Sequence, residues 1–170
     1  MPSDESKFYD MTCQAIQELF ELHSYSTDFE VIGGRGKCRV PVRFLKTKAL
    51  QKYASQLPTP DIMGLVKKGT RESNLVLVEF KSEPRYRDIF QTKGYNELYR
   101  SDFTFLISRE PMFKSSKKTL DFVRHDHKLL RVRYGRRLYI MFLHKTSEGK
   151  ITLAQSAVEV GAFEYPDLDL

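Results

Sequence analysis

The segment from Asn74 to Lys81 is the part of this 170-residue chain that most constrains its fold. It reads Asn-Leu-Val-Leu-Val-Glu-Phe-Lys, and an apolar run of this kind, rich in β-branched residues, predicts a strand buried in a sheet. A charge in such a strand is costly unless it is paired or holds a metal ion. Glu79 and Lys81 lie two residues apart, so their side chains share one face of the strand.

A second acidic residue, Asp61, opens another apolar segment at hairpin distance, so residues 61–66 predict a neighbouring strand. Two carboxylates and an ammonium at one sheet edge are groups that a hard divalent cation and a phosphodiester require. The backbone carbonyl of Phe80 is a further candidate ligand. The alternative is an ordinary ion pair between Glu79 and Lys81. The four apolar residues before Glu79 and the Pro60-Asp61 step favour a metal site.

The rest of the chain alternates between helical and extended patterns. We expect helices at 6–23, 47–56, 85–99 and 116–130, and further strands at 27–32, 38–44, 102–108, 137–143 and 151–160. This order predicts an α/β fold with a mixed central β-sheet flanked by helices. The length is typical of one domain, so we expect a single domain over residues 1–170.

Pro60-Asp61 followed by Glu79-Phe80-Lys81 resembles the PD-(D/E)XK nuclease superfamily, and the resemblance covers about residues 61–108. It implies a restriction-endonuclease-like core in which Asp61 and Glu79 bind Mg2+ or Mn2+ and Lys81 assists the attacking water. Gln91 and Tyr95 match the QxxxY motif of RecB-like members, which implies that they place the DNA strand near the metal. Residues four apart share a helix face, so these two side chains would lie together.

Two departures from the family pattern matter. The chain has two cysteines, whereas the iron–sulfur cluster of some RecB-like members needs four. Family members often place a further ligand on the first helix, and Glu18 is the candidate here, with Glu21 and His23 as alternatives. A solvated glutamate is an equally good interpretation of Glu18.

The formal net charge of +6 favours an anionic partner. Arg85, Arg87 and Lys93 lie near the candidate site in sequence, and Arg35 lies in a glycine-rich turn, so all four are candidate DNA contacts. A basic segment follows over residues 114–137. It predicts either a surface that tracks a phosphate backbone or a solvated face.

The leading hypothesis is therefore a metal-dependent deoxyribonuclease that hydrolyses phosphodiester bonds. The alternatives are a non-catalytic nucleic-acid-binding module, and a subunit that binds a protein partner through its acidic C-terminal tail, residues 165–170. The preferred DNA structure, exonuclease versus endonuclease action and a homodimeric arrangement stay open. The polar N-terminus and the lack of a long apolar run predict an intracellular, cytoplasmic protein without a membrane span.

Overall fold

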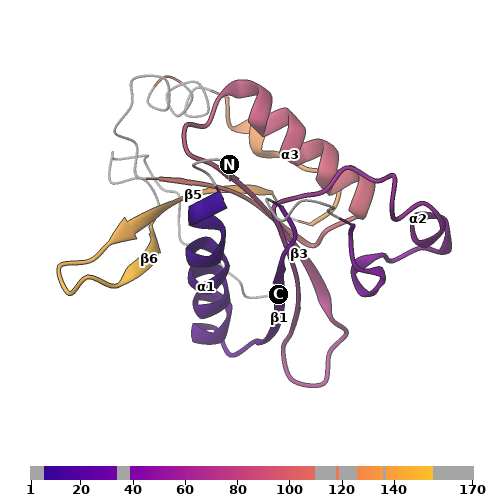
Figure 1. Ribbon diagram of the computed structural model, residues 1–170, viewed down its shortest axis with the longest axis horizontal. Helices are drawn as coiled ribbons and strands as arrows, with labels where there is room; N and C mark the ends of the chain where they lie inside the picture. The colour runs from indigo at the N-terminus through magenta and orange to yellow at the C-terminus, as the bar shows by residue number, and fades with distance from the viewer. Residues whose placement is uncertain (1–5, 34–38, 110–117, 119–125, 136, 155–170) are drawn as a thin grey trace.

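The computed structural model of the chain describes residues 6–33, 39–109, 118, 126–135 and 137–154 (Figure 1). The described residues form helices α1 (Ser6–Leu22), α2 (Lys48–Lys52) and α3 (Tyr86–Tyr99), and 3-10 helices η1 (Val42–Phe44) and η2 (His127–Leu130). They also form strands β1 (Ser26–Val31), β2 (Ile62–Lys67), β3 (Asn74–Lys81), β4 (Phe103–Arg109), β5 (Leu138–Lys145) and β6 (Ile151–Ala154).

Within the described residues, six strands form one sheet in the order β1-β2-β3-β4-β5-β6. The pairs β1–β2, β2–β3 and β5–β6 are antiparallel, whereas β3–β4 and β4–β5 are parallel. Parallel neighbours need a long connection, and α3 supplies it between β3 and β4. The predicted α/β class, a mixed central sheet flanked by helices, is confirmed. None of the described helices has both the length and the apolar character needed to cross a membrane.

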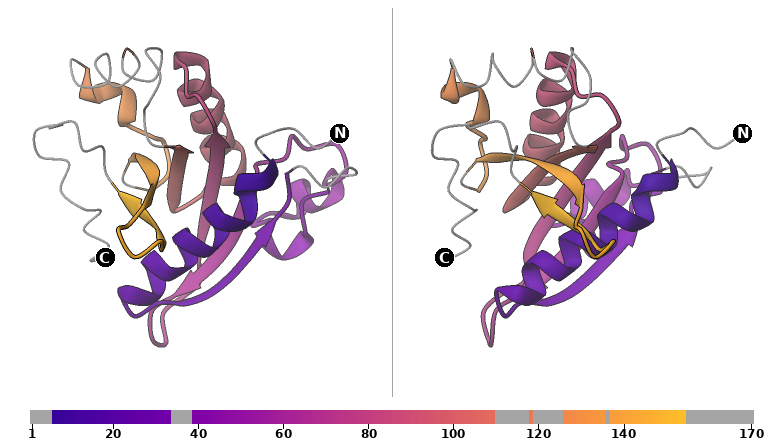
Figure 2. Two further views of the ribbon diagram at one scale, coloured as in Figure 1. Left: turned by 60° about the vertical axis from the view of Figure 1, so that its left-hand side comes forward. Right: turned by 90° about the vertical axis from the view of Figure 1, so that its left-hand side faces the viewer.

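The long helices α1 and α3 cover opposite faces of the sheet (Figure 2). Strand β3 shows this in its alternation, because Val78 and Phe80 pack in the apolar cluster under α1 while Leu77 packs in the cluster under α3. All three side chains are fully buried. Alternate residues of a strand share one face, so Glu79 and Lys81 lie on the same face as Leu77. The end of β3 therefore presents both charged groups to the α3 side.

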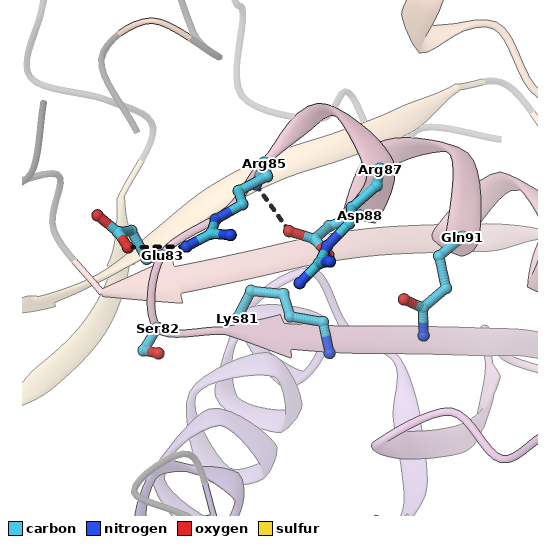
Figure 3. A pocket seen from close by; sticks show the side chains of 7 residues that line it. All are labelled: Lys81, Ser82, Glu83, Arg85, Arg87, Asp88 and Gln91. Atoms are coloured by element: carbon cyan, nitrogen blue, oxygen red, sulfur yellow. Dashed lines mark hydrogen bonds and ion pairs between the residues drawn. The ribbon is translucent and has the colours of Figure 1, made fainter. Parts of the chain in front are cut away.

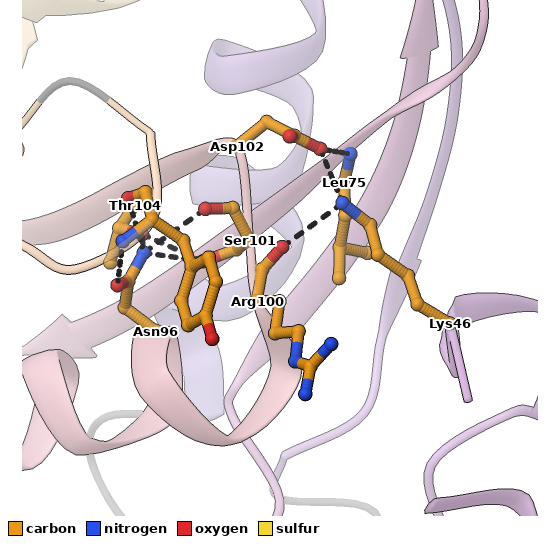
Figure 4. Close-up of polar contacts among 8 residues, drawn as sticks. Lys46, Leu75, Asn96, Arg100, Ser101, Asp102 and Thr104 are labelled. Atoms are coloured by element: carbon orange, nitrogen blue, oxygen red, sulfur yellow. Dashed lines mark hydrogen bonds and ion pairs between the residues drawn. The ribbon is translucent and has the colours of Figure 1, made fainter. Parts of the chain in front are cut away.

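A polar cluster around Asn96 fixes the C-terminal half of α3 against the sheet (Figure 4). The buried Asn96 amide donates to the hydroxyl of Thr104 on β4 and to the carbonyl of Tyr134. Its oxygen accepts a hydrogen bond from the Tyr134 N–H. Because buried amides are costly when unpaired, these bonds hold α3 in one position over β3 and β4.

Three predicted elements differ from the structure. The helix expected at 47–56 is shorter, since α2 covers Lys48–Lys52. Residues 42–44 form η1 rather than part of a strand over 38–44, and residue 38 lies outside the described residues. Pro41 lacks the N–H that a ladder needs, and the alternation arose because Val40 and Phe44 both fill the cluster under α3. Of the helix predicted over 116–130, residues 116–117 and 119–125 lie outside the described residues. Its end at 127–130 is the 3-10 helix η2, which begins where the Asp126 side chain accepts from the Lys128 N–H.

Candidate active site at the end of strand β3

Asp61 lies beside Glu79 because β2 and β3 pair in an antiparallel register that joins Ile62 to Val78. Its main-chain carbonyl accepts hydrogen bonds from the N–H groups of Ile32 (2.8 Å) and Gly33 (2.9 Å). Its side-chain Oδ2 accepts from the Phe80 N–H at 2.8 Å. Asp61 is therefore held by the ends of β1 and β3, and its carboxylate cannot move independently of the sheet.

Glu79 is 2% exposed, and its two oxygens have different surroundings. Oε1 accepts from Lys81 Nζ at 2.8 Å and from Gln91 Nε2 at 3.1 Å. Oε2 is buried and has no hydrogen-bond partner among the described residues. A buried carboxylate oxygen without a donor is costly, so it marks a place where a further positive group would be stabilised.

The electrostatics of Glu79 follow from this burial. Loss of solvation, and then the charge of Asp61, raise the pKa of Glu79 to about 7, while the Lys81 ammonium and the backbone of Asp61 oppose the rise. Burial of the carboxylate thus outweighs its ion pair with Lys81. Two carboxylates with one ammonium leave this corner of the sheet short of positive charge.

Gln91 and Tyr95 meet at this corner, as their four-residue spacing predicts. The Gln91 amide donates to the Tyr95 hydroxyl at 3.0 Å as well as to Glu79, and the Tyr95 hydroxyl donates to the Thr59 carbonyl at 3.4 Å. Burial raises the pKa of Tyr95, so the phenol stays protonated. A chain of hydrogen bonds therefore links α3 to Glu79 and to the segment that leads into Asp61.

An open pocket of about 330 Å3 adjoins these groups (Figure 3). Its lining comes from the end of β3, the following turn and the first turns of α3: Lys81, Ser82, Glu83, Arg85, Arg87, Asp88 and Gln91. The side chains of Arg85 and Arg87 are 59% and 78% exposed. The buried Asp88 carboxylate accepts from the Arg85 N–H at 2.7 Å, which fixes the start of α3. The pocket is thus bordered by cations that solvent, or an anion, can reach.

The structure brings together Asp61, Glu79, Lys81, Gln91 and Tyr95. The Phe80 main chain also lies in the site, whereas its ring points to the other face and stacks on Phe8.

Other candidates lie elsewhere. Glu18 is on α1, which covers the opposite face of the sheet, and it pairs with Lys150 at 2.9 Å. That pair lowers the pKa of Glu18. Lys93 donates to the Leu129 carbonyl at 3.2 Å. Arg35 and the acidic tail lie outside the described residues.

Gly33 is a site residue that its position in a glycine-rich turn did not reveal. A Cβ on Gly33 would lie 2.5 Å from Asp61 Oδ1 and 2.9 Å from Asp61 Cα, both closer than real contacts allow. The sequence does show a glycine directly after the apolar end of β1. It does not show that this glycine contacts Asp61, because Asp61 comes from a distant part of the chain.

The donor set fits a hard divalent cation. Mg2+ binds through one or two carboxylates and keeps several waters, and the unpartnered Oε2 of Glu79 beside Asp61 offers such ligands. No group of three His, Cys, Asp or Glu residues in the described part of the chain is placed to form a larger cage.

Comparison with known proteins found a structural similarity. No family model and no curated protein matches the sequence. The fold is similar to a solved structure described as the crystal structure of pre-specific restriction endonuclease BsaWI–DNA complex, with a TM-score of 0.49 and 11% identity. The similarity covers 86% of this chain and 55% of that one, so the chain spans about half the length of that endonuclease.

Proposed function

We propose that this chain is a Mg2+- or Mn2+-dependent deoxyribonuclease with a restriction-endonuclease-like core and a PD-(D/E)XK site of the RecB-like type. The observation that carries the proposal is the buried Glu79 carboxylate. One of its oxygens accepts hydrogen bonds from Lys81 and Gln91, and the other lacks a donor among the described residues. The second acid, Asp61, directly precedes the neighbouring strand β2. An ordinary surface ion pair would need neither the burial nor the second acid.

Each residue then has a defined part. Asp61 and Glu79 hold the cation, with the Phe80 carbonyl as a further ligand. When bound, the cation lowers the pKa of water and neutralises charge on the phosphate. Lys81, whose ammonium lies 2.8 Å from Glu79 Oε1, would orient or deprotonate the attacking water or stabilise the developing negative charge. Gln91 keeps Glu79 in one orientation.

The pocket beside the site supports DNA as the substrate. Arg85 and Arg87 border it with exposed guanidinium groups. A guanidinium group can bind two phosphate oxygens at once. The rival function is a DNA-binding module without catalysis. The buried pair of carboxylates argues against that function, because burying two acids is costly and phosphate binding does not require it.

A cleavage assay on labelled single strands, duplexes, flaps and junctions, with Mg2+, Mn2+ or EDTA, tests the proposal. We expect metal-dependent cleavage that Asp61→Ala, Glu79→Ala and Lys81→Ala each abolish, with far-UV circular dichroism unchanged. The matched control is Glu148→Gln, an exposed acid in the turn between β5 and β6, which should cleave as the wild type does. Salt-sensitive DNA binding without cleavage in any metal would instead establish the binding module.

A further inference from the structure

An exposed aromatic strip runs along α3 beside the pocket. Tyr86 and Phe90 lie one turn apart and are 42% and 57% exposed. The Tyr86 hydroxyl donates to the Lys118 carbonyl at 3.4 Å, and Phe90 is the more exposed ring. Arg87 and Gln91, each one residue further along and so about 100° around the helix, line the pocket. The aromatic strip and the pocket are therefore adjacent faces of one helix.

Gly94 leaves the ring of Phe90 uncovered. Helical side chains lean toward the N-terminus, so a side chain at position 94 would lie over Phe90. A Cβ at Gly94 would meet no atom within 4 Å, and the backbone there is ordinary helix. The fold thus gives no steric reason for a glycine that costs a helix interior about 1 kcal/mol. Its consequence is an open surface next to an aromatic ring.

The charges around this strip favour a nucleic acid over an apolar partner. Arg87 is 78% exposed, and it stands between the strip and the pocket. Of the nearby acids, the buried Asp88 caps the helix and pairs with Arg87 at 3.8 Å, and Glu83 pairs with Arg85 at 3.8 Å. Glu97, two turns beyond Phe90, is an exposed acid on the same side of the helix. Open aromatic rings beside cations are what proteins use to stack the bases of a single strand while holding its phosphates.

We propose that Tyr86, Phe90 and the open surface at Gly94 form a stacking surface for an unpaired base of single-stranded DNA, with the adjoining phosphate beside Arg87. The choice of DNA rests on the proposed function, and the proposal narrows its substrate to single-stranded segments. In a closed duplex the bases are stacked on each other and their faces cannot reach Phe90.

Binding measured without cleavage tests this proposal. The probe is a labelled oligothymidine, alone or annealed to oligoadenosine, followed by fluorescence anisotropy in EDTA. Phe90→Ala should weaken single-strand binding about tenfold, since stacking on an aromatic is worth about 1–3 kcal/mol per base, and Phe90→Tyr should restore it. Duplex binding should change less than about twofold. Leu22→Ala, which truncates an apolar side chain 80% exposed at the end of α1, should bind both probes as the wild type does.

Gly94→Leu gives a second test that loss of folding cannot imitate. Leucine is a better helix former than glycine, so the unfolding temperature should rise, while the new side chain covers Phe90 and weakens single-strand binding. Unchanged single-strand binding in Phe90→Ala, or an equal loss on the duplex, would overturn the proposal. Loss of single-strand binding by Phe90→Ala in a protein that cuts no DNA would uphold this inference and reject the nuclease.

Discussion

The main-chain N–H of Phe80 donates a hydrogen bond of 2.8 Å to Oδ2 of Asp61. This bond joins the acid that precedes β2 to the residue between Glu79 and Lys81 on β3. The three charged groups of the site therefore share one rigid frame, in which the backbone sets the separation of the carboxylates. Catalytic groups positioned by strands are held more firmly than groups on loops.

Two replacements of Asp61 should separate its structural role, accepting the Phe80 N–H, from its proposed role as a metal ligand. Asp61→Asn keeps an oxygen that can accept from Phe80, whereas Asp61→Ala leaves that buried N–H unpaired at a cost of about 1–3 kcal/mol. Both variants should lose cleavage, but only Asp61→Ala should lose stability in urea denaturation. Equal stability of the two variants would show that the Phe80 bond does not hold the frame together.

Gly33→Ala should disturb the site through Asp61. The added methyl would lie 2.5 Å from Oδ1 and 2.9 Å from Cα of Asp61, and the main-chain atom cannot rotate away. We expect a loss of about 1–3 kcal/mol in unfolding free energy, and Mn2+ binding, followed by calorimetry, weakened at least tenfold. Gly94→Ala, whose methyl meets open space, is the stability control and should not destabilise the protein. Normal Mn2+ affinity in Gly33→Ala would mean that Asp61 adapts.

Asn96→Ala should destabilise the whole domain rather than the chemistry alone. The buried amide forms hydrogen bonds with Ser101, Thr104 and Tyr134. Its removal leaves several donors and acceptors of these residues unpaired. We expect a loss of about 3 kcal/mol in thermal or urea unfolding. Asn96→Asp keeps the acceptor for the Tyr134 N–H but loses the donors, so it should also be destabilised. Wild-type stability in Asn96→Ala would contradict the assigned role.

The parts of the fold that the sequence predicts well are those set by local pattern. Strand β3 has the predicted bounds, Asn74–Lys81, because burial on both faces gives a continuous apolar run with a charged end. Gln91 and Tyr95 meet because a helix places residues four apart on one face. Asp61 reaches Glu79 because a short antiparallel connection fixes the register.

What the sequence could not supply depends on contacts between distant segments. The amides of Ile32 and Gly33 hold Asp61 only because β1 pairs with β2, and no local pattern gives that partner. The helical spacing around Glu18 predicts its helix but not which face of the sheet the helix covers. The alternation at Val40 and Phe44 reports burial in a cluster, which a 3-10 turn and a strand both satisfy.

In EDTA, the stability of the protein should depend on pH through Glu79. Burial and Asp61 raise the pKa of Glu79 from an ordinary 4.5 to about 7. Below pH 4.5 the carboxyl is protonated in both states, so it costs nothing. Between pH 4.5 and about 7 the unfolded chain releases the proton first, so folding stability falls, and above pH 7 the loss of about 3 kcal/mol is complete. Glu79→Gln has no titrating carboxyl group at this position. Urea unfolding should therefore show that the stability of the variant relative to the wild type is greater at pH 8 than at pH 5. A difference between the two proteins that stays constant with pH would mean that Lys81 compensates Glu79 fully.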